Sequence, residues 1–252
     1  MSQHTVSGVM GPVEIITEVR PNTKSNELVI LLHGAYGYPF HSEQTKYQWL
    51  ADRLEKKYNV GYYQSSRKFV WSDYPSMTFE EYADNAFAGK TFAQEYEDVK
   101  TAIAVITNQL KKHRITVRKV NLVGFSLGGI MSLLIAKQFD LVEGILMVGT
   151  SINFDIPVTK PLFGDFPAKA TIYELLKSFQ GDISIMYGGG DDLSKFEEAM
   201  ELFNSASNAR SREIELLRGV DHRFISIDGA NREDELNDYI FSKIVKMAEK
   251  TF

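Results

Sequence analysis

The chain has 252 residues, of which 44% are hydrophobic and 24% are charged. These fractions are ordinary for a folded globular protein and exclude an intrinsically disordered one. The formal net charge is −5, so the sequence does not favour nucleic acid or an anionic membrane surface as a partner. The absence of cysteine excludes disulfides, thiolate nucleophiles and cysteine-bound zinc.

The amino-terminal residues Met1–Thr5 show neither the basic start nor the apolar run of a secretory signal. No stretch approaches ~18 consecutive apolar residues, the length of a membrane-spanning helix. We therefore expect a cytoplasmic protein without a membrane span.

Short apolar runs alternate with longer amphipathic stretches along the chain. The runs predicted to form strands are Val13–Val19, Leu28–Leu32, Val60–Tyr63, Val120–Gly124, Gly144–Gly149, Ile183–Tyr187 and Glu213–Leu217. The stretches predicted to form helices are Glu43–Tyr58, Phe92–His113, Ser126–Phe139, Ser194–Ala206 and Glu233–Ala248. Because strands alternate with helices and several strands are continuously apolar, we expect a doubly wound, mostly parallel α/β sheet with helices on both faces. No repeat or linker divides the chain, so residues 1–252 are predicted to form one domain.

Two connections in this pattern are longer than the few residues usual in α/β folds. They are Gln64–Thr91 and Thr150–Asp182, and both are rich in aromatic residues. Ligands of such sheets bind at the carboxyl ends of the strands, so these segments are candidate pocket walls, with residues 150–182 as a small lid. The alternative is that each is a packed excursion with its own small core.

The most specific pattern is Gly124-Phe125-Ser126-Leu127-Gly128-Gly129, a G-x-S-x-G sequence between a predicted strand and a predicted buried helix. A strand that turns sharply into a helix leaves its serine in a strained backbone conformation with the hydroxyl exposed, and Gly124 and Gly128 provide the room for such a turn. The helix amino terminus also stabilises negative charge beside the serine. Ser126 is therefore the predicted nucleophile.

A serine hydroxyl needs a base to activate it, and the base needs a carboxylate to orient it. Among the 5 histidines, only His222 lies in a loop after a late strand, so it is the predicted base. The carboxylate is expected between serine and histidine in the chain. Asp191 follows a predicted strand and is preferred, and Asp192 and Asp155 remain alternatives.

A second glycine-rich turn, His33-Gly34-Ala35-Tyr36-Gly37, directly follows a predicted strand. Backbone N–H groups in this turn and at Leu127 would stabilise a developing oxyanion if they faced the same point. We predict Leu127 and Ala35 as the donors, with Tyr36 as a further candidate. His33 and Gly34 are predicted to support the turn, not to react.

The two glycine-rich turns, the Gly188–Asp191 segment and His222 occur in the order and spacing of the α/β-hydrolase superfamily, which the chain resembles from about Val13 to Ala248. The resemblance implies an eight-stranded, mostly parallel sheet and a triad of Ser126, Asp191 and His222. It also implies hydrolysis of an ester, thioester or amide through an acyl-enzyme, without a cofactor.

Two features depart from the superfamily pattern. Many relatives have an Asp-x-Arg-Gly-x-Gly turn after the fourth strand, where this chain has Tyr62-Tyr63-Gln64-Ser65-Ser66-Arg67. The segment 150–182 is also too short for a full helical cap domain. Because of these two departures, the resemblance does not identify the substrate.

Other patterns carry no chemistry in this reading. Gly89-Lys90-Thr91 resembles the end of a phosphate-binding loop, but Asp84 stands where that motif needs glycine, so the motif is rejected. No His-Glu-x-x-His motif or close histidine pair suggests a metal site. The acidic runs, at residues 80–81, 197–198 and 233–235, are predicted to be solvated helix faces.

The sequence therefore predicts a serine hydrolase that acts without a cofactor on a carboxylic ester or thioester of a small, apolar or aromatic molecule. Acyl transfer, C–C bond hydrolysis and lyase chemistry on the same triad remain alternatives, because fold and triad do not separate them. A ligand-binding protein that has lost turnover is a further alternative. The oligomeric state is not predicted.

Overall fold

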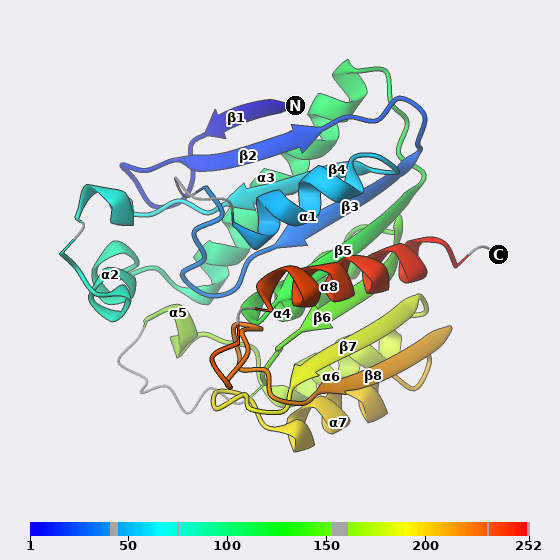
Figure 1. Ribbon diagram of the computed structural model, residues 1–252. Helices are drawn as coiled ribbons and strands as arrows, with labels where there is room; N and C mark the ends of the chain where they lie inside the picture. The colour runs from blue at the N-terminus through cyan, green and yellow to red at the C-terminus, as the bar shows by residue number, and fades with distance from the viewer. Residues whose placement is uncertain (41–44, 75, 153–160, 231, 251–252) are drawn as a thin grey trace.

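The computed structural model describes residues 1–40, 45–74, 76–152, 161–230 and 232–250. Its centre is an eight-stranded sheet with the strand order β1-β2-β4-β3-β5-β6-β7-β8 (Figure 1). The strands are β1 Ser2–Val6, β2 Ile15–Arg20, β3 Glu27–Leu32, β4 Asn59–Gln64, β5 Lys119–Phe125, β6 Val142–Val148, β7 Asp182–Gly188 and β8 Ser211–Leu217. The pairs β1–β2 and β2–β4 are antiparallel, and the other pairs are parallel. The predicted mostly parallel sheet is confirmed.

Helices cover both faces of the sheet. They are α1 Lys46–Leu54, the short 3₁₀ helix η1 Trp71–Asp73, α2 Phe79–Ala86, α3 Phe92–Lys112, α4 Leu127–Ala136, α5 Pro161–Gly164, α6 Lys169–Ser178, α7 Phe196–Ser205 and α8 Glu233–Ala248. Helices α1 and α8 pack on one face, and α3, α4, α6 and α7 pack on the other (Figure 1). The doubly wound architecture predicted from the sequence is therefore present.

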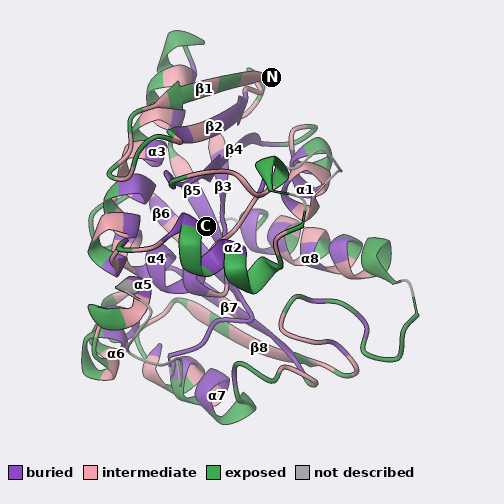
Figure 2. Cartoon of the chain, turned by 90° about the vertical axis from the view of Figure 1, so that its left-hand side faces the viewer, coloured by how far each residue is buried: buried purple, intermediate pink, exposed green. Residues whose placement is uncertain are grey.

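The central strands are apolar at successive positions because both faces are buried. In β3, Leu28, Ile30 and Leu32 join the core beneath α3 and α4, whereas Val29 and Leu31 join the core beneath α1 and α8. This division follows from the period of two along a strand. Figure 2 shows these strands as buried and the outer surfaces of the helices as exposed.

Threonine caps fix where several helices begin. Helices α1, α2 and α3 all begin with capping boxes, at Thr45, Thr78 and Thr91. The hydroxyl of each threonine accepts a hydrogen bond from the backbone N–H three residues later. The threonine's own backbone N–H donates to the side chain of that later residue. The cap at Thr45 shortens the first predicted helix, which was expected over Glu43–Tyr58. Residues 41–44 lie outside the described part of the chain.

Other elements also differ from the expectations, among them the unpredicted helices α2 and α6. The sequence pattern missed β1, whose residues alternate between partly buried and exposed and are mostly polar. The helix expected from Ser126 to Phe139 begins one residue later and ends at Ala136. The acidic pair on α7 is not wholly solvated, because Glu198 is buried and accepts a hydrogen bond from the Ser151 hydroxyl at 2.7 Å.

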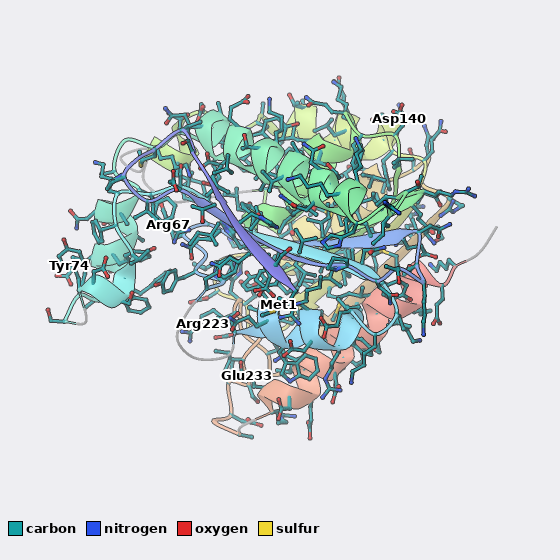
Figure 3. All side chains as sticks on the ribbon, turned by 90° about the horizontal axis from the view of Figure 1, so that it is seen from above. Met1, Arg67, Tyr74, Asp140, Arg223 and Glu233 are labelled. Atoms are coloured by element: carbon teal, nitrogen blue, oxygen red, sulfur yellow. The ribbon has the colours of Figure 1, made fainter. Side chains whose placement is uncertain are left out.

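The two long connections contain structure of their own. The segment Gln64–Thr91 includes η1 and α2 and has a small core in which Tyr82, Ala86 and Phe87 are buried. Figure 3 shows Tyr74 at the outer end of this excursion and Arg67 where it joins the sheet. The segment 150–182 contains α5 and α6. Residues 153–160 of it, including the candidate Asp155, lie outside the described residues, and its role as a lid stays a prediction.

Within the described ranges, no helix combines the length and the apolar composition that crossing a membrane requires.

Candidate active site

Ser126 lies between the last residue of β5 and the first residue of α4. Its backbone has φ 51° and ψ −118°, a conformation that non-glycine residues seldom adopt. Three hydrogen bonds hold it there. Its N–H donates to the Val148 carbonyl of β6 at 2.8 Å, and its own carbonyl accepts from the Gly129 N–H at 2.9 Å. The Thr150 hydroxyl donates to the same carbonyl at 3.1 Å. The neighbouring strand and helix thus impose the strained conformation.

The glycines of the elbow are required by contact with backbone. A Cβ atom on Gly124 would lie 2.3 Å from the Gly128 carbonyl carbon. A Cβ atom on Gly128 would lie 2.4 Å from the Leu32 carbonyl oxygen at the end of β3. Because these neighbours are main-chain atoms, no side-chain rotation relieves the clash. The G-x-S-x-G pattern therefore encodes the close approach of β3, β5 and α4.

His222 reaches the serine from the loop after β8. Its Nε2 lies 3.0 Å from the Ser126 Oγ. The loop is tight: Val220 and Ser226 pair as an isolated bridge, and the Asp221 carboxylate accepts from the Arg223 and Ile225 N–H groups at 2.9 and 2.8 Å. The imidazole is thus presented by a turn with its own hydrogen bonds.

Asp191 follows β7 and faces the other side of the imidazole. Its Oδ2 lies 2.9 Å from the His222 Nδ1. Its Oδ1 accepts from the backbone N–H groups of Leu193 and Ser194, both at 2.9 Å. The Asp191 side chain is completely buried, whereas Asp192 is exposed. Of the two neighbouring aspartates, the structure brings Asp191 to the histidine.

These contacts define the tautomer of His222. An ionised carboxylate only accepts hydrogen bonds, so the proton on the side facing Asp191 belongs to Nδ1. Nε2 then carries a lone pair and accepts from the Ser126 hydroxyl. The arrangement is a serine next to a base that is itself oriented by a carboxylate, the geometry of a nucleophilic triad.

The turn after β3 lies against the elbow. A Cβ atom on Gly34 would lie 3.1 Å from the Ser126 Cβ. The Gly37 N–H donates to the Gly34 carbonyl at 3.1 Å, and Tyr36 has φ 60°, which is typical of the third residue of a type II turn. The turn that holds Ala35 and Tyr36 is thus next to the serine.

His33 fixes the orientation of one peptide in this turn. Its Nε2 accepts from the Ser65 N–H at 3.3 Å, so its Nδ1 carries the proton and donates to the Gly34 carbonyl at 2.7 Å. Burial lowers the pKa of His33 to about 4, which keeps the ring neutral at pH 7. In a trans peptide the C=O and N–H point in opposite directions, so the Ala35 N–H points away from His33. Leu127, at the first position of α4, has an N–H without a partner in the regular helix pattern.

Several residues near the site escaped the sequence analysis. Thr150 is one, and its only signal was its place directly after β6 at the same edge of the sheet. Arg67 is another: its side chain is fully buried, and its Nη2 donates to the Gly37 carbonyl at 2.9 Å. Lys90, dismissed with the phosphate-loop pattern, is also fully buried.

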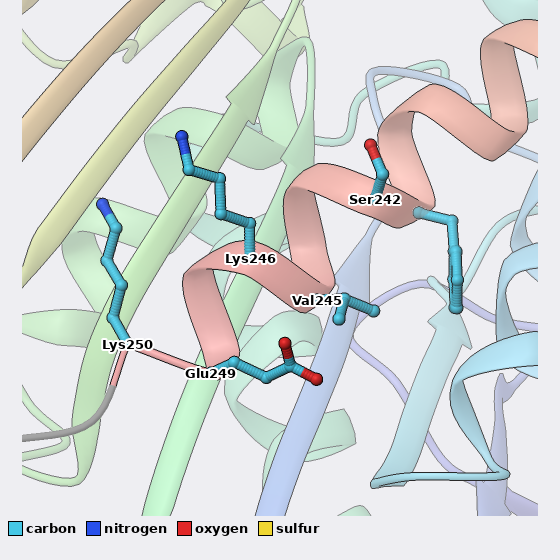
Figure 4. Close-up of a pocket in the computed structure, with 6 residues that line it drawn as sticks. Ser242, Val245, Lys246, Glu249 and Lys250 are labelled. Atoms are coloured by element: carbon cyan, nitrogen blue, oxygen red, sulfur yellow. The ribbon is translucent and has the colours of Figure 1, made fainter.

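A surface hollow of about 510 Å³ lies elsewhere, along the carboxyl-terminal half of α8 (Figure 4). Its lining includes Val245, Lys246 and Lys250. Lys119 at the start of β5 donates to the Ala248 carbonyl, so this hollow is at the amino ends of the strands, opposite the triad. Among the described residues, no group of three or more histidine, aspartate or glutamate side chains is arranged to hold a metal ion.

The sheet order and the strand–serine–helix elbow place the chain in the α/β-hydrolase superfamily. Solved structures with this fold include a dienelactone hydrolase from Anabaena variabilis, with 13% identity, a TM-score of 0.62, and coverage of 98% of this chain and 96% of that one. The Pyrococcus furiosus esterase Pf2001 has 14% identity, a TM-score of 0.66, and coverage of 99% and 92%. Est1E from Butyrivibrio proteoclasticus, solved with ferulic acid bound, has 12% identity, a TM-score of 0.61, and coverage of 94% and 96%. At these identities the likeness concerns the fold.

Within this superfamily, the sequence also matches one particular protein family. Residues 24–185 match the PGAP1-like alpha/beta domain, and the chain belongs to this family. No curated protein sequence matches the chain significantly. The matched range includes the glycine-rich turn His33–Gly37 and the serine elbow, whereas Asp191 and His222 lie beyond its end.

Proposed function

We propose that this protein is a serine hydrolase that cleaves a carboxylic ester or thioester of a small, apolar or aromatic molecule. The observation that carries the proposal is the continuous chain of contacts from Asp191 through His222 to the Ser126 hydroxyl, at 2.9 and 3.0 Å. The three residues come from three separate strand ends, so their alignment is not a consequence of sequence proximity.

In the first half of the reaction, the Ser126 Oγ attacks the acyl carbon while His222 Nε2 takes the hydroxyl proton. Asp191 stabilises the imidazolium that forms. The acyl oxygen becomes negative and accepts hydrogen bonds from the N–H groups of Leu127 and Ala35, or of Tyr36. The tetrahedral intermediate then expels the alcohol or thiol, which receives the proton from Nε2, and leaves an acyl group on Oγ.

In the second half, water replaces the alcohol. His222 removes a proton from the water as its oxygen attacks the acyl carbon, and the proton then passes to Ser126 Oγ as the acid leaves. Bonds, protons and charge balance with water as the only other reactant, so the cycle needs no cofactor.

The turn His33–Gly37 is called the oxyanion turn below, after its proposed role, and aromatic side chains beside it support an apolar substrate. The ring of Tyr36 packs edge-on against Phe87 at 5.1 Å and against Phe163 at 6.3 Å between centroids. Phe87 belongs to the α2 excursion and Phe163 to α5. Phe87 is buried beneath the Tyr36 ring, whereas Phe163 is partly exposed. The apolar surface next to the proposed oxyanion site, where an acyl or alcohol group would lie, therefore includes Tyr36 and Phe163.

The experiment is a series of p-nitrophenyl acetate, butyrate and octanoate esters assayed with wild-type protein and with Ser126→Ala, His222→Ala and Asp191→Asn. We expect turnover by the wild type and a loss on the order of 10⁴–10⁶ in kcat in each variant, since removing any member disables the triad. Ser242→Ala, on the exposed surface of α8, is the matched control and should keep full activity.

Three results would speak against the proposal. Turnover that persists in Ser126→Ala would place the nucleophile elsewhere. Folded wild-type protein without turnover on any of the esters would favour a ligand-binding protein with a hydrolase fold. Transfer of the acyl group to an added alcohol in preference to water would point to an acyltransferase on the same triad.

A further inference from the structure

Lys90 is a buried cation that makes two hydrogen bonds and a close ion pair. Its side chain is fully buried, and its ammonium lies 2.7 Å from the Ser66 carbonyl, 2.7 Å from the Asp98 Oδ2 and 2.6 Å from the Glu95 Oε2. An ammonium has three protons to donate, and three oxygens surround it. Because an unpaired buried charge is costly, this arrangement requires both carboxylates to be in place.

The Lys90–Asp98 pair holds the backbone of the segment that follows β4. The Ser66 N–H and hydroxyl both donate to the Asp98 Oδ2, at 2.9 and 2.5 Å, while the Ser66 carbonyl accepts from Lys90. Every polar backbone atom of Ser66 is thus bound by this pair. The lysine comes from the loop before α3 and the aspartate from α3 itself.

Ser65 and Arg67, on either side of Ser66, connect to the oxyanion turn through hydrogen bonds. Ser65 donates its N–H to His33, which fixes the Gly34 carbonyl. Arg67 donates its Nη2 to the Gly37 carbonyl at 2.9 Å, and its Nε returns to the Ser65 carbonyl at 3.0 Å. Both ends of the turn are therefore bound to a three-residue segment whose middle residue is held by Lys90 and Asp98.

The charges in this network balance. Lys90 and Arg67 are cationic, Glu95 and Asp98 are anionic, and His33 is neutral. The Glu95 Oε1 lies 3.9 Å from the His33 Nε2, so the same carboxylate that pairs with Lys90 also faces the histidine. Removal of the lysine charge would leave two buried carboxylates beside the turn with a single arginine.

We propose that Lys90 is a positioning residue for the oxyanion turn, acting through Ser66 and its neighbours on His33 and Arg67. The catalytic part of this inference rests on the proposed function. An oxyanion donor acts mainly in the transition state, so a displaced turn should reduce kcat and leave KM largely unchanged.

The test compares Lys90→Met with Asp182→Asn. Asp182 is a matched control, since its buried carboxylate is bound by Arg210 and Ser211 at the amino end of β7, remote from the triad. For Lys90→Met we expect kcat on the best ester to fall about tenfold or more with KM within about threefold. Hydrogen exchange of the peptide that contains Ala35 and Tyr36 should accelerate. Asp182→Asn should lose stability but keep kcat and the exchange of the turn.

Lys90→Met protein that matches Asp182→Asn in both kcat and turn exchange would overturn the proposal. If the wild type shows no ester turnover, the proposed function fails, and the exchange measurement alone decides the role of Lys90. If Lys90→Met does not fold, Glu95→Gln replaces it, because it removes the charge of the second carboxylate bound to Lys90 and preserves the side-chain shape. For Glu95→Gln, a smaller fall in kcat and a smaller acceleration of turn exchange than expected for Lys90→Met support the proposal. Unchanged kcat and unchanged exchange in this variant refute it.

Discussion

His33 should make the free energy of unfolding depend on pH between about 6.5 and 4. Burial lowers the pKa of this histidine from 6.5 to about 4, so in this window the unfolded chain binds a proton that the folded chain does not. Acidification therefore favours the unfolded state. This difference in pKa between the unfolded and the folded chain corresponds to about 3 kcal/mol in the free energy of unfolding. The contribution is fully present above pH 6.5 and is lost progressively as the pH falls to about 4. Solvent does not screen this group, because its side chain is only 1% exposed.

The measurement is urea unfolding at pH values from 7 to 4 for wild type and His33→Asn. Asparagine does not titrate, and its amide can donate to the Gly34 carbonyl in place of Nδ1. Carboxylates titrate in both proteins, so the difference between the two pH profiles isolates the histidine. We expect the wild type to lose about 3 kcal/mol more than the variant over this range. Parallel profiles would refute the inference that His33 is buried and neutral.

Two further substitutions test packing and local structure. Gly128→Ala should destabilise the fold by about 1–3 kcal/mol and reduce activity, because its methyl group would meet the Leu32 carbonyl at 2.4 Å. Gly164→Ala is its control, since a Cβ atom there meets nothing within 4 Å, and equal urea midpoints for the two variants would contradict the clash. Thr91→Ala should cost about 1 kcal/mol, because it removes the acceptor for the Gln94 N–H at the start of α3. An unchanged unfolding midpoint would show that this capping box contributes nothing.

The parts of the fold that the sequence predicts are those with local causes. Continuous apolar runs such as Leu28–Leu32 predict strands because both of their faces are buried. The elbow is predictable because the clashes at Gly124 and Gly128 leave no other residue type in so tight a turn. The strand Ser2–Val6 is not predictable in this way, since an edge strand with one exposed side needs no apolar run.

The candidate site could be predicted only where strand ends could be recognised. His222 and Asp191 follow predicted strands, and the parallel sheet brings those ends to one edge. The sequence favoured Asp191 but did not exclude Asp192, because the choice depends on the backbone direction after β7. Lys90 and Arg67 gave no signal, because their partners are brought to them by tertiary packing and the sequence shows only isolated charges.

The most direct test of the proposed mechanism is the intact mass of the protein after treatment with a fluorophosphonate, followed by peptide mapping. We expect one phosphonyl group per chain, carried by the peptide that contains Ser126, and no adduct in Ser126→Ala. Labelling of the folded Ser126→Ala variant, or a single adduct on a different serine of the wild type, would contradict the assignment of Ser126 as the nucleophile.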